Sequence, residues 1–226
     1  MKTKNYYEKY WQKRKKETKE PIRSIIPSFL RQFSQYGAIA NQIPSGSKIL
    51  DLGCGDGNVS QLFLKKGEVV GIDISKEALK KAERRGIKTK LHDLNQLPLS
   101  FGDKSFDVVV LTDTLEHLFD PLGILKEVLR ILTVGGRVII TVPNFARLEN
   151  RLKMLWGDPV DILHWEKYGD GKEHFHWFAK GKIEHFLKLT GFKKIKFVPT
   201  GLPFGFILGK LGFPGLARML TVVGKK

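Results

Sequence analysis

Cysteine is almost absent from this chain of 226 residues, which has only Cys54. A disulfide within the chain is therefore excluded, and a cysteine-based zinc cluster is disfavoured. No hydrophobic run is long enough to span a bilayer, and the uncharged stretch at residues 197–209 is short and rich in proline and glycine. The lysine-rich residues 1–20 have no apolar centre of a secretory signal. These absences predict a cytoplasmic protein that is large enough to fold without disulfides or metals.

Acidic residues are few compared with basic ones, 23 against 39, which gives a net charge of +16. The excess lies in two flanks, because residues 1–48 and residues 144–226 each carry eight surplus positive charges, whereas residues 49–143 are balanced. Basic flanks indicate an anionic substrate, RNA or another nucleic acid, or an anionic membrane surface as partner. A lysine-rich solvated surface explains the same charge equally well.

Glycine is concentrated in residues 49–57, where the apolar strand Ile49-Leu50-Asp51-Leu52 runs into Gly53-Cys54-Gly55-Asp56-Gly57. Gly53 and Gly55 tolerate backbone angles and close approaches that a Cβ atom would forbid. Such a turn lets a ligand touch the backbone at the start of the next segment.

The segments that follow this turn complete a strand–helix–strand unit. Residues 59–64 predict the start of a helix, and residues 69–73 predict a second buried strand that ends in Asp73. An acid at that position accepts hydrogen bonds from ribose hydroxyls, as in adenosine-containing cofactors. Asn58 stands where a dinucleotide fingerprint would need glycine, and the carboxylates beside the turn would repel a pyrophosphate.

Residues 49–57 resemble the first motif of class I S-adenosylmethionine (SAM) methyltransferases. The resemblance implies a Rossmann-like three-layer α/β/α sandwich, with a seven-stranded, mainly parallel sheet and an antiparallel last strand. It covers residues 45–145 closely and continues more loosely through residues 174–192 and the final strand, residues 220–223. It also implies methyltransferase activity with SAM as cofactor.

Later segments support the same order of strands and helices. Residues 87–91, with Ile87 and Leu91 at the ends, predict a third strand before Asp93, and the β-branched residues 106–111 predict a strand buried on both faces. Pro121 opens a helix that Gly135-Gly136 should stop, before a fifth strand at residues 138–142.

The resemblance assigns cofactor contacts to the ends of the first three strands and of the fourth. Asp51, Gly53 and Gly55 should surround the methionine part, Asp73 the ribose, and Asp93 with Leu94 the adenine. The complete expected set is Asp51, Gly53, Cys54, Gly55, Asp73, Ile74, Asp93, Leu94 and Thr112.

Histidines supply the remaining candidates. His117 follows the fourth strand beside Glu116, where a substrate should meet the methyl group, so it is a candidate general base or else a helix-cap or core histidine. His174 and His176 should point to the same side of an extended segment, but no third ligand stands at a usual spacing. The sequence therefore predicts no metal site.

We expect a single methyltransferase domain over residues 1–226. Residues 1–44 would form a basic, helical N-terminal cap, residues 45–143 the SAM-binding core, and residues 144–226 a substrate lid and the last two strands. Tyr7, Tyr10 and Trp11 lie at helical spacing in the cap, where an aromatic face packs against its own domain or stacks on nucleic acid.

The expected acceptor is a small organic molecule, anionic or amphiphilic, methylated on oxygen, nitrogen or carbon. This follows from a resemblance to quinone-biosynthesis and methionine-biosynthesis methyltransferase-like proteins. RNA or protein methylation is an alternative, and so is a SAM-binding regulatory subunit without catalytic activity. The oligomeric state stays open.

Overall fold

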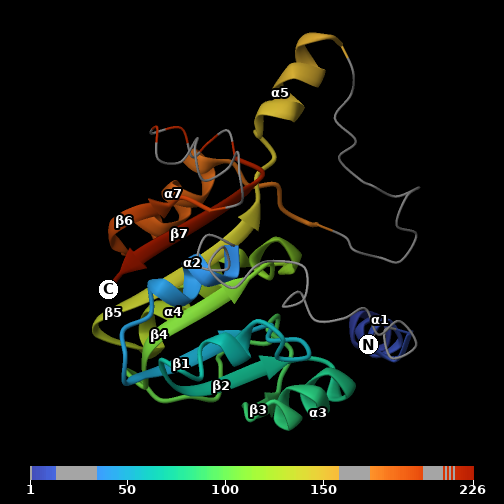
Figure 1. Ribbon diagram of the computed structural model, residues 1–226, viewed down its shortest axis with the longest axis vertical. Helices are drawn as coiled ribbons and strands as arrows, with labels where there is room; N and C mark the ends of the chain where they lie inside the picture. Colours follow the sequence, from blue (N-terminus) through green and yellow to red (C-terminus); the bar gives the residue numbers. More distant parts are fainter. Residues whose placement is uncertain are drawn as a thin grey trace.

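A seven-stranded sheet with helices on both faces forms the centre of the computed structural model (Figure 1). The structure describes residues 2–13, 35–157, 174–200, 211, 213, 215 and 217–226. The strand order is β3-β2-β1-β4-β5-β7-β6. Neighbouring strands are parallel except at β7, which runs antiparallel to both β5 and β6. The predicted Rossmann-like sandwich with a reversed last strand is confirmed.

The strands expected from the sequence are all present, although the fifth begins at Leu132 instead of residue 138. The strands are β1 (Ser47–Leu52), β2 (Gly67–Asp73), β3 (Lys88–Leu91), β4 (Phe106–Thr112), β5 (Leu132–Pro143), β6 (Lys193–Val198) and β7 (Met219–Lys225). The α-helices are α1 (Lys2–Lys13), α2 (Gln35–Asn41), α3 (Lys76–Arg84), α4 (Pro121–Ile131), α5 (Leu148–Leu155) and α7 (Lys180–Leu189). Two short 3₁₀ turns, η3 (Ser60–Leu62) and η4 (Leu115–His117), follow β1 and β4.

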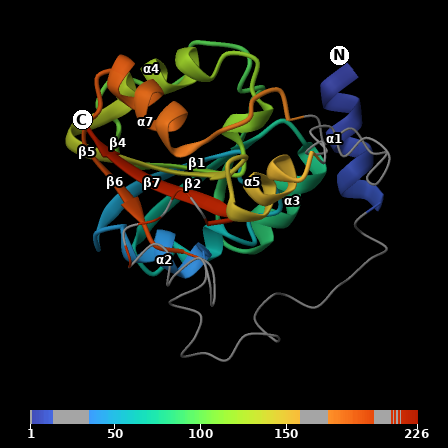
Figure 2. The ribbon, with the colours of Figure 1, turned by 90° about the horizontal axis from the view of Figure 1, so that it is seen from above.

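The core consists of two apolar clusters, one on each face of the sheet. Successive side chains of a strand point to opposite faces, so in β1 Leu50 packs with α4 and α7, whereas Ile49 packs with α2 and α3. Both of these β1 side chains are fully buried. Figure 2, seen along the layers, shows the sheet between the two sets of helices.

Two predicted details differ from the structure. The helix expected at residues 59–64 is only the short turn η3, because the Ser60 hydroxyl donates to Asp51 and the chain reaches β2 within a few residues. Gly135-Gly136 does not stop the preceding helix, which already ends at Ile131. Instead this pair lies inside β5, at an irregular stretch where the register with β4 shifts.

The strand order places a crevice where ligands bind in such sheets. β1 lies between β2 and β4, so the connections from β1 and β4 leave in opposite directions along the sheet. Open α/β sheets bind ligands at the carboxyl ends of the strands beside this reversal. Among the described residues, no helix is both long and apolar enough to cross a membrane.

Candidate functional site

A cavity of about 580 Å³ opens at the carboxyl ends of β1, β2 and β4. Its volume falls within the range of about 300–1,000 Å³ that is typical of small-molecule sites. The cavity is lined by Tyr7, Tyr10, Trp11, Tyr36, Gly53, Cys54, Gly55, Asp56, Asn58, Val59, Asp73, Ile74, His92, Asp93, Leu94, Asn95, Thr112, Asp113, Thr114, Glu116, His117, Leu118, Pro143, His174 and Met219. All the predicted site residues except Asp51 are in this set.

The glycine turn after β1 is held by close contacts within the protein. Gly53 has a φ of 79°, and a Cβ atom there would lie 2.5 Å from the Thr114 hydroxyl oxygen. Gly55 has a φ of 54°, and a Cβ atom would lie 2.8 Å from the ring of Trp11. Since both angles are in the left-handed region, side chains are excluded by strain as well as by space. These glycines therefore bring η4 and α1 against the turn.

Asp73 ends β2 and ties the turn to the start of α3. Its carboxylate accepts hydrogen bonds from the N–H groups of Gly55 and Ser75, both at 2.9 Å. Burial raises the pKa of Asp73, while these two N–H groups act in the opposite direction. A carboxylate has about four acceptor positions, so Asp73 keeps capacity for ligand hydroxyls.

Asp51 lies below the cavity rather than on its wall. One carboxylate oxygen accepts a hydrogen bond of 2.6 Å from the Ser60 hydroxyl, and the other has no partner among the described residues. Burial raises the pKa of Asp51 to about 6, although the bond from Ser60 opposes the rise. Its direct contact with the cofactor stays a prediction, whereas its link to η3 is visible in the structure.

Cys54 is buried in the turn and packs against β2. A Cβ atom at Gly71 would lie 2.6 Å from its sulfur, which shows how closely the two segments approach. Burial raises the pKa of the Cys54 thiol far above its ordinary value, and the carboxylate of Asp51 adds to the rise. Because the thiolate is the reactive form, Cys54 has a packing role.

The ends of β3 and β4 supply the other predicted cofactor residues. Asp93 accepts hydrogen bonds from the Asn95 N–H at 3.0 Å and from the Asn95 side-chain amide at 3.3 Å. Leu94 beside it is almost completely buried, and Ile74 follows Asp73 on the same wall. The buried hydroxyl of Thr112 has no hydrogen-bond partner among the described residues.

Glu116, which was not among the predicted site residues, contributes a buried carboxylate to the cavity. It is 1% exposed, and neither carboxylate oxygen has a hydrogen-bond partner among the described residues. Burial raises the pKa of Glu116 to about 8, and the nearby charge of Asp113 adds to the rise. Asp113 itself has a φ of 51°, a left-handed conformation that aspartate tolerates better than most residues. In the sequence, the position of Glu116 beside His117 was the only indication that Glu116 belongs to the site.

His117 meets His174 across the cavity rather than standing alone. Their rings are 4.7 Å apart between centroids, in an edge-to-face arrangement. Ligand-capable atoms of Glu116, His117 and His174 lie within 4.8 Å of one another, a spacing that suits one cation. His176, which was expected to point to the same side as His174, is not in the cavity lining, and its ring contacts the Phe119 carbonyl and the Phe178 ring.

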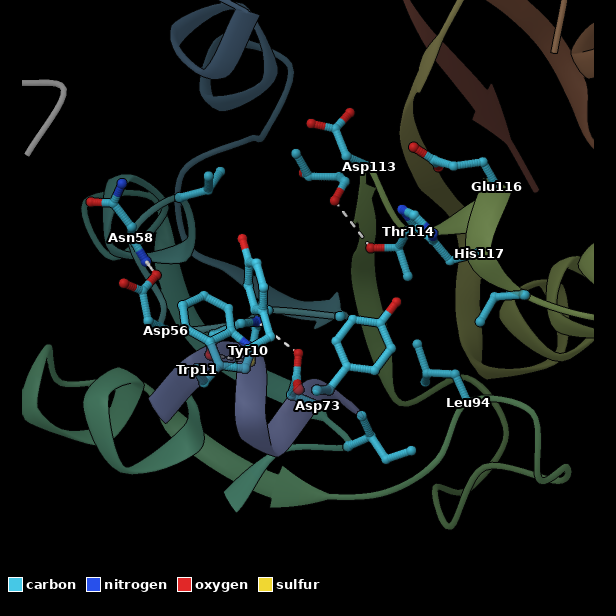
Figure 3. Close-up of a pocket in the computed structure, with 18 of the residues that line it drawn as sticks. Tyr10, Trp11, Asp56, Asn58, Asp73, Leu94, Asp113, Thr114, Glu116 and His117 are labelled. Carbon is cyan, nitrogen blue, oxygen red and sulfur yellow. Dashed lines mark hydrogen bonds between the residues drawn. The ribbon is translucent and has the colours of Figure 1, made fainter. Parts of the chain in front are cut away.

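The aromatic residues of α1 form a wall that sequence reasoning did not assign to the site. Tyr7, Tyr10 and Trp11 all line the cavity, and Figure 3 shows Tyr10 and Trp11 near Asp73, on the side away from Glu116. Their helical spacing predicted an aromatic face, but nothing in it identified the surface that this face covers. The structure favours packing against the domain over stacking on nucleic acid.

The charge of the described lining is negative. It includes five carboxylates, those of Asp56, Asp73, Asp93, Asp113 and Glu116, and neither lysine nor arginine. Opposite charges attract strongly where water is partly excluded, so this wall suits a cationic ligand such as a sulfonium with an ammonium group. The residues present therefore fit SAM.

Comparisons with known proteins support this interpretation. A family model described as methionine biosynthesis protein MetW matches residues 33–196. Ubiquinone biosynthesis O-methyltransferase of Pasteurella multocida is 28% identical over 203 residues, which cover 76% of this chain and 81% of that protein. The bifunctional methionine biosynthesis protein MetXA/MetW of Rhodopirellula baltica is 33% identical over 131 residues, 54% of this chain, and the match spans only 20% of that longer protein.

Solved structures agree on the fold. A SAM-dependent methyltransferase of Thermotoga maritima, described as a possible histamine N-methyltransferase, superposes with a TM-score of 0.66 at 20% identity, covering 88% of this chain and 92% of its own. The sheet, the cavity and these relatives define a class I SAM-dependent methyltransferase, with SAM as cofactor. Within that class the chain belongs to the MetW family, whose model matches most of its length.

Proposed function

We propose that this chain transfers the methyl group of SAM to a small organic acceptor, using His117 as general base. The observation that carries the proposal is one continuous cavity, which joins the predicted cofactor residues at β1 and β2 to His117 and Glu116 after β4. Donor and acceptor can therefore occupy the same space. Holding two reactants in line is worth roughly 7–11 kcal/mol of the barrier.

The cofactor side is assigned as the sequence predicts. Asp73 would bind the ribose hydroxyls, Asp93 and Leu94 the adenine, and Gly53 with Gly55 the methionine part. Asp51, Cys54, Ile74 and Thr112 complete the predicted set. When bound, SAM supplies an electrophilic methyl group. The described residues orient it and cover it.

The acceptor side has to orient a nucleophile and remove its proton. Histidine is the side chain whose unperturbed pKa lies near neutrality, which suits a histidine at this position to accept a proton at physiological pH. His174 packs against that ring and would fix its orientation. In this proposal the raised pKa of Glu116, about 8, keeps its carboxyl protonated at neutral pH, where it can donate a hydrogen bond to an acceptor oxygen.

The described lining favours an amphiphilic acceptor over an anionic one. The four aspartates of the lining would repel an anion, whereas Leu118, Pro143 and Met219 offer apolar contact. The proposal includes methylation of the acceptor on oxygen, nitrogen or carbon. The proposed domain division, with a cap at residues 1–44, a core at residues 45–143 and a lid at residues 144–226, places Met219 in the lid, and Leu118 and Pro143 in the core.

The test is transfer of a labelled methyl group from SAM to small-molecule, lipid, RNA and protein fractions of a cell extract, run with wild type and His117→Asn. Label in one small-molecule or lipid fraction with wild type, strongly reduced in the variant, supports the proposal. Label only in RNA or protein would contradict it. Repeating the assay after dialysis against EDTA separates base catalysis, which persists, from a cation held by Glu116, His117 and His174.

A regulatory role is the second candidate, and the fused relative favours it. In the Rhodopirellula baltica protein, a MetW part is joined to a MetXA part within one bifunctional chain. A separate chain of this family could therefore act on a partner enzyme. Measured SAM binding without methyl transfer to any fraction, together with a stoichiometric partner in purification, would favour this role over catalysis.

A further inference from the structure

Helix α1 lies outside the part of the chain that the family model matches, yet it contributes to the cavity wall. The match to the family model begins at residue 33, whereas α1 spans Lys2–Lys13. Figures 1 and 2 both show α1 beside α3, at the end of the sheet that β2 and β3 form. Three of its aromatic side chains line the cavity. The wall that they form comes from residues that the family model does not match.

Glu8 anchors α1 to the rest of the protein. Its carboxylate accepts hydrogen bonds from the Ser75 hydroxyl at 3.0 Å, the Lys76 N–H at 2.8 Å and the Glu77 N–H at 3.4 Å. The first N–H groups of a helix have no partner within it, and a carboxylate there also interacts favourably with the helix dipole. Glu8 therefore serves as a cap for α3 that is supplied from another helix.

Trp11 forms the second attachment. It is 8% exposed, and its ring lies so close to Gly55 that a Cβ atom on that glycine would be 2.8 Å away. The Lys81 ammonium lies 5.5 Å from the centre of the Trp11 ring and donates to the Trp11 carbonyl at 3.3 Å. Trp11 belongs to neither of the two core clusters. The side chain of Trp11 is therefore buried against the glycine turn and α3, and not within the apolar core.

The two attachments converge on the proposed cofactor site. Ser75, which Glu8 contacts, also donates its N–H to Asp73, and Gly55, which Trp11 contacts, donates its N–H to the same carboxylate. Asp73 is the proposed ribose ligand. The position of α1 is therefore connected to Asp73 through two separate backbone hydrogen bonds.

We propose that α1 is a cofactor clasp: Glu8 and Trp11 fix the helix to α3 and the glycine turn, so that Tyr7 and Tyr10 close the cavity over the adenosine part of SAM. The inference rests on the proposed assignment of Asp73. Coupling between two binding events is reciprocal, so SAM strengthens the docking of α1 by the same factor by which docked α1 strengthens SAM binding. Glu8 acts as a positioning residue, since it is not part of the cavity lining.

The experiment compares full-length wild type with Glu8→Ala, Trp11→Ala and the control Glu68→Ala. Calorimetry gives the dissociation constants for SAM and its demethylated product, and hydrogen exchange of residues 2–13 is followed with and without that product. Glu68 is a suitable control because its half-exposed carboxylate pairs with Lys88, at the far end of β2 from Asp73. We expect roughly tenfold weaker SAM binding in both α1 variants, unchanged binding in the control, and slower exchange of α1 when the ligand is bound.

Further outcomes separate this inference from the assignment on which it rests. Weaker binding in Asp73→Ala, with wild-type affinity in Glu8→Ala and Trp11→Ala, overturns the clasp and leaves the ribose assignment intact. Wild-type affinity in all three variants overturns both. Glu8→Gln keeps one acceptor oxygen, so it should recover part of the affinity lost in Glu8→Ala. Equal thermal melting of the unliganded variants shows that the core is intact, and exchange of α1 that ignores the ligand contradicts the clasp.

Discussion

The two sides of the cavity differ in how the carboxylates that line them are hydrogen-bonded. On the cofactor side, Asp73 accepts two backbone hydrogen bonds and Asp93 accepts two from Asn95. On the acceptor side, the carboxylate of Glu116 is buried without a hydrogen-bond partner among the described residues. Carboxylates already fixed by hydrogen bonds suit the binding of a cofactor that does not vary. A buried acid without a partner is typical of a group that takes part in the reaction. The cofactor side should therefore govern affinity, and the acceptor side turnover.

The largest expected effect falls on turnover. His117→Asn removes the proposed base, so kcat for methyl transfer should fall by about 10²–10⁴-fold, while the dissociation constant of SAM stays unchanged. The matched control is His185→Asn, an exposed histidine on α7. Steady-state kinetics and calorimetry measure the two quantities. A wild-type kcat in His117→Asn would remove the base and the contrast between the two sides.

The second expected effect is on the affinity for SAM, which the cofactor side governs. Asp73→Ala removes hydrogen bonds of a charged group, each worth about 1.5–3 kcal/mol, so SAM binding should weaken by at least about tenfold. Asp103→Asn, which alters an exposed carboxylate paired with Arg130, serves as the control. Calorimetry of both variants is the measurement, and equal SAM affinity in the two would place the ribose elsewhere.

Two glycines allow the packing of the turn to be separated from its backbone strain. Gly53 and Gly46 have almost the same φ, 79° and 78°, but a Cβ atom meets Thr114 only at Gly53. Gly46→Ala should cost about 1–2 kcal/mol of stability from the left-handed conformation alone. Gly53→Ala should cost a further 1–3 kcal/mol, approximately, from overpacking. The free energy of unfolding of both variants, measured in urea, tests this. Equal decreases would mean that Thr114 moves aside without destabilising the protein.

The smallest expected effect is a change in how stability depends on pH. The pKa of Glu116 is about 8 in the folded protein and 4.5 in its ordinary state. Between these values the folded chain holds a proton that the unfolded chain releases, so stability falls as pH rises from about 4.5 to 8. Glu116→Gln should flatten this decline. Thermal melting across that pH range is the measurement, and parallel curves for wild type and variant would show that the carboxyl is not perturbed.

Local patterns made the cofactor side predictable from the sequence. Gly53 follows the apolar β1 directly, Asp73 ends β2 and Asp93 comes two residues after β3, and the carboxyl ends of parallel strands meet at one edge of a sheet. The mainly parallel sheet with its reversed last strand follows from the family resemblance. The prediction of a helix at residues 59–64 was wrong. A hydrogen bond between the side chains of Ser60 and Asp51 takes part in forming the turn, and the spacing of apolar residues gives no sign of it.

Contacts between distant segments made the rest unpredictable. Glu8 bonds to Ser75 across 67 positions of sequence, and His174 meets His117 through a segment whose path no short motif indicates. The aromatic spacing in α1 correctly predicted a face but could not name its partner. Burial of Glu116 likewise depends on what packs over η4, which is a property of the whole fold.

The segment that brings His174 to the cavity is attached by its backbone alone at one point. The N–H groups of Phe175 and His176 both donate to the Glu116 carbonyl, at 2.9 and 3.2 Å. Every amino acid except proline carries that donor. Side chains on this wall can therefore be exchanged without losing the attachment, so a chain of this design can acquire a new acceptor while its donor site stays as it is.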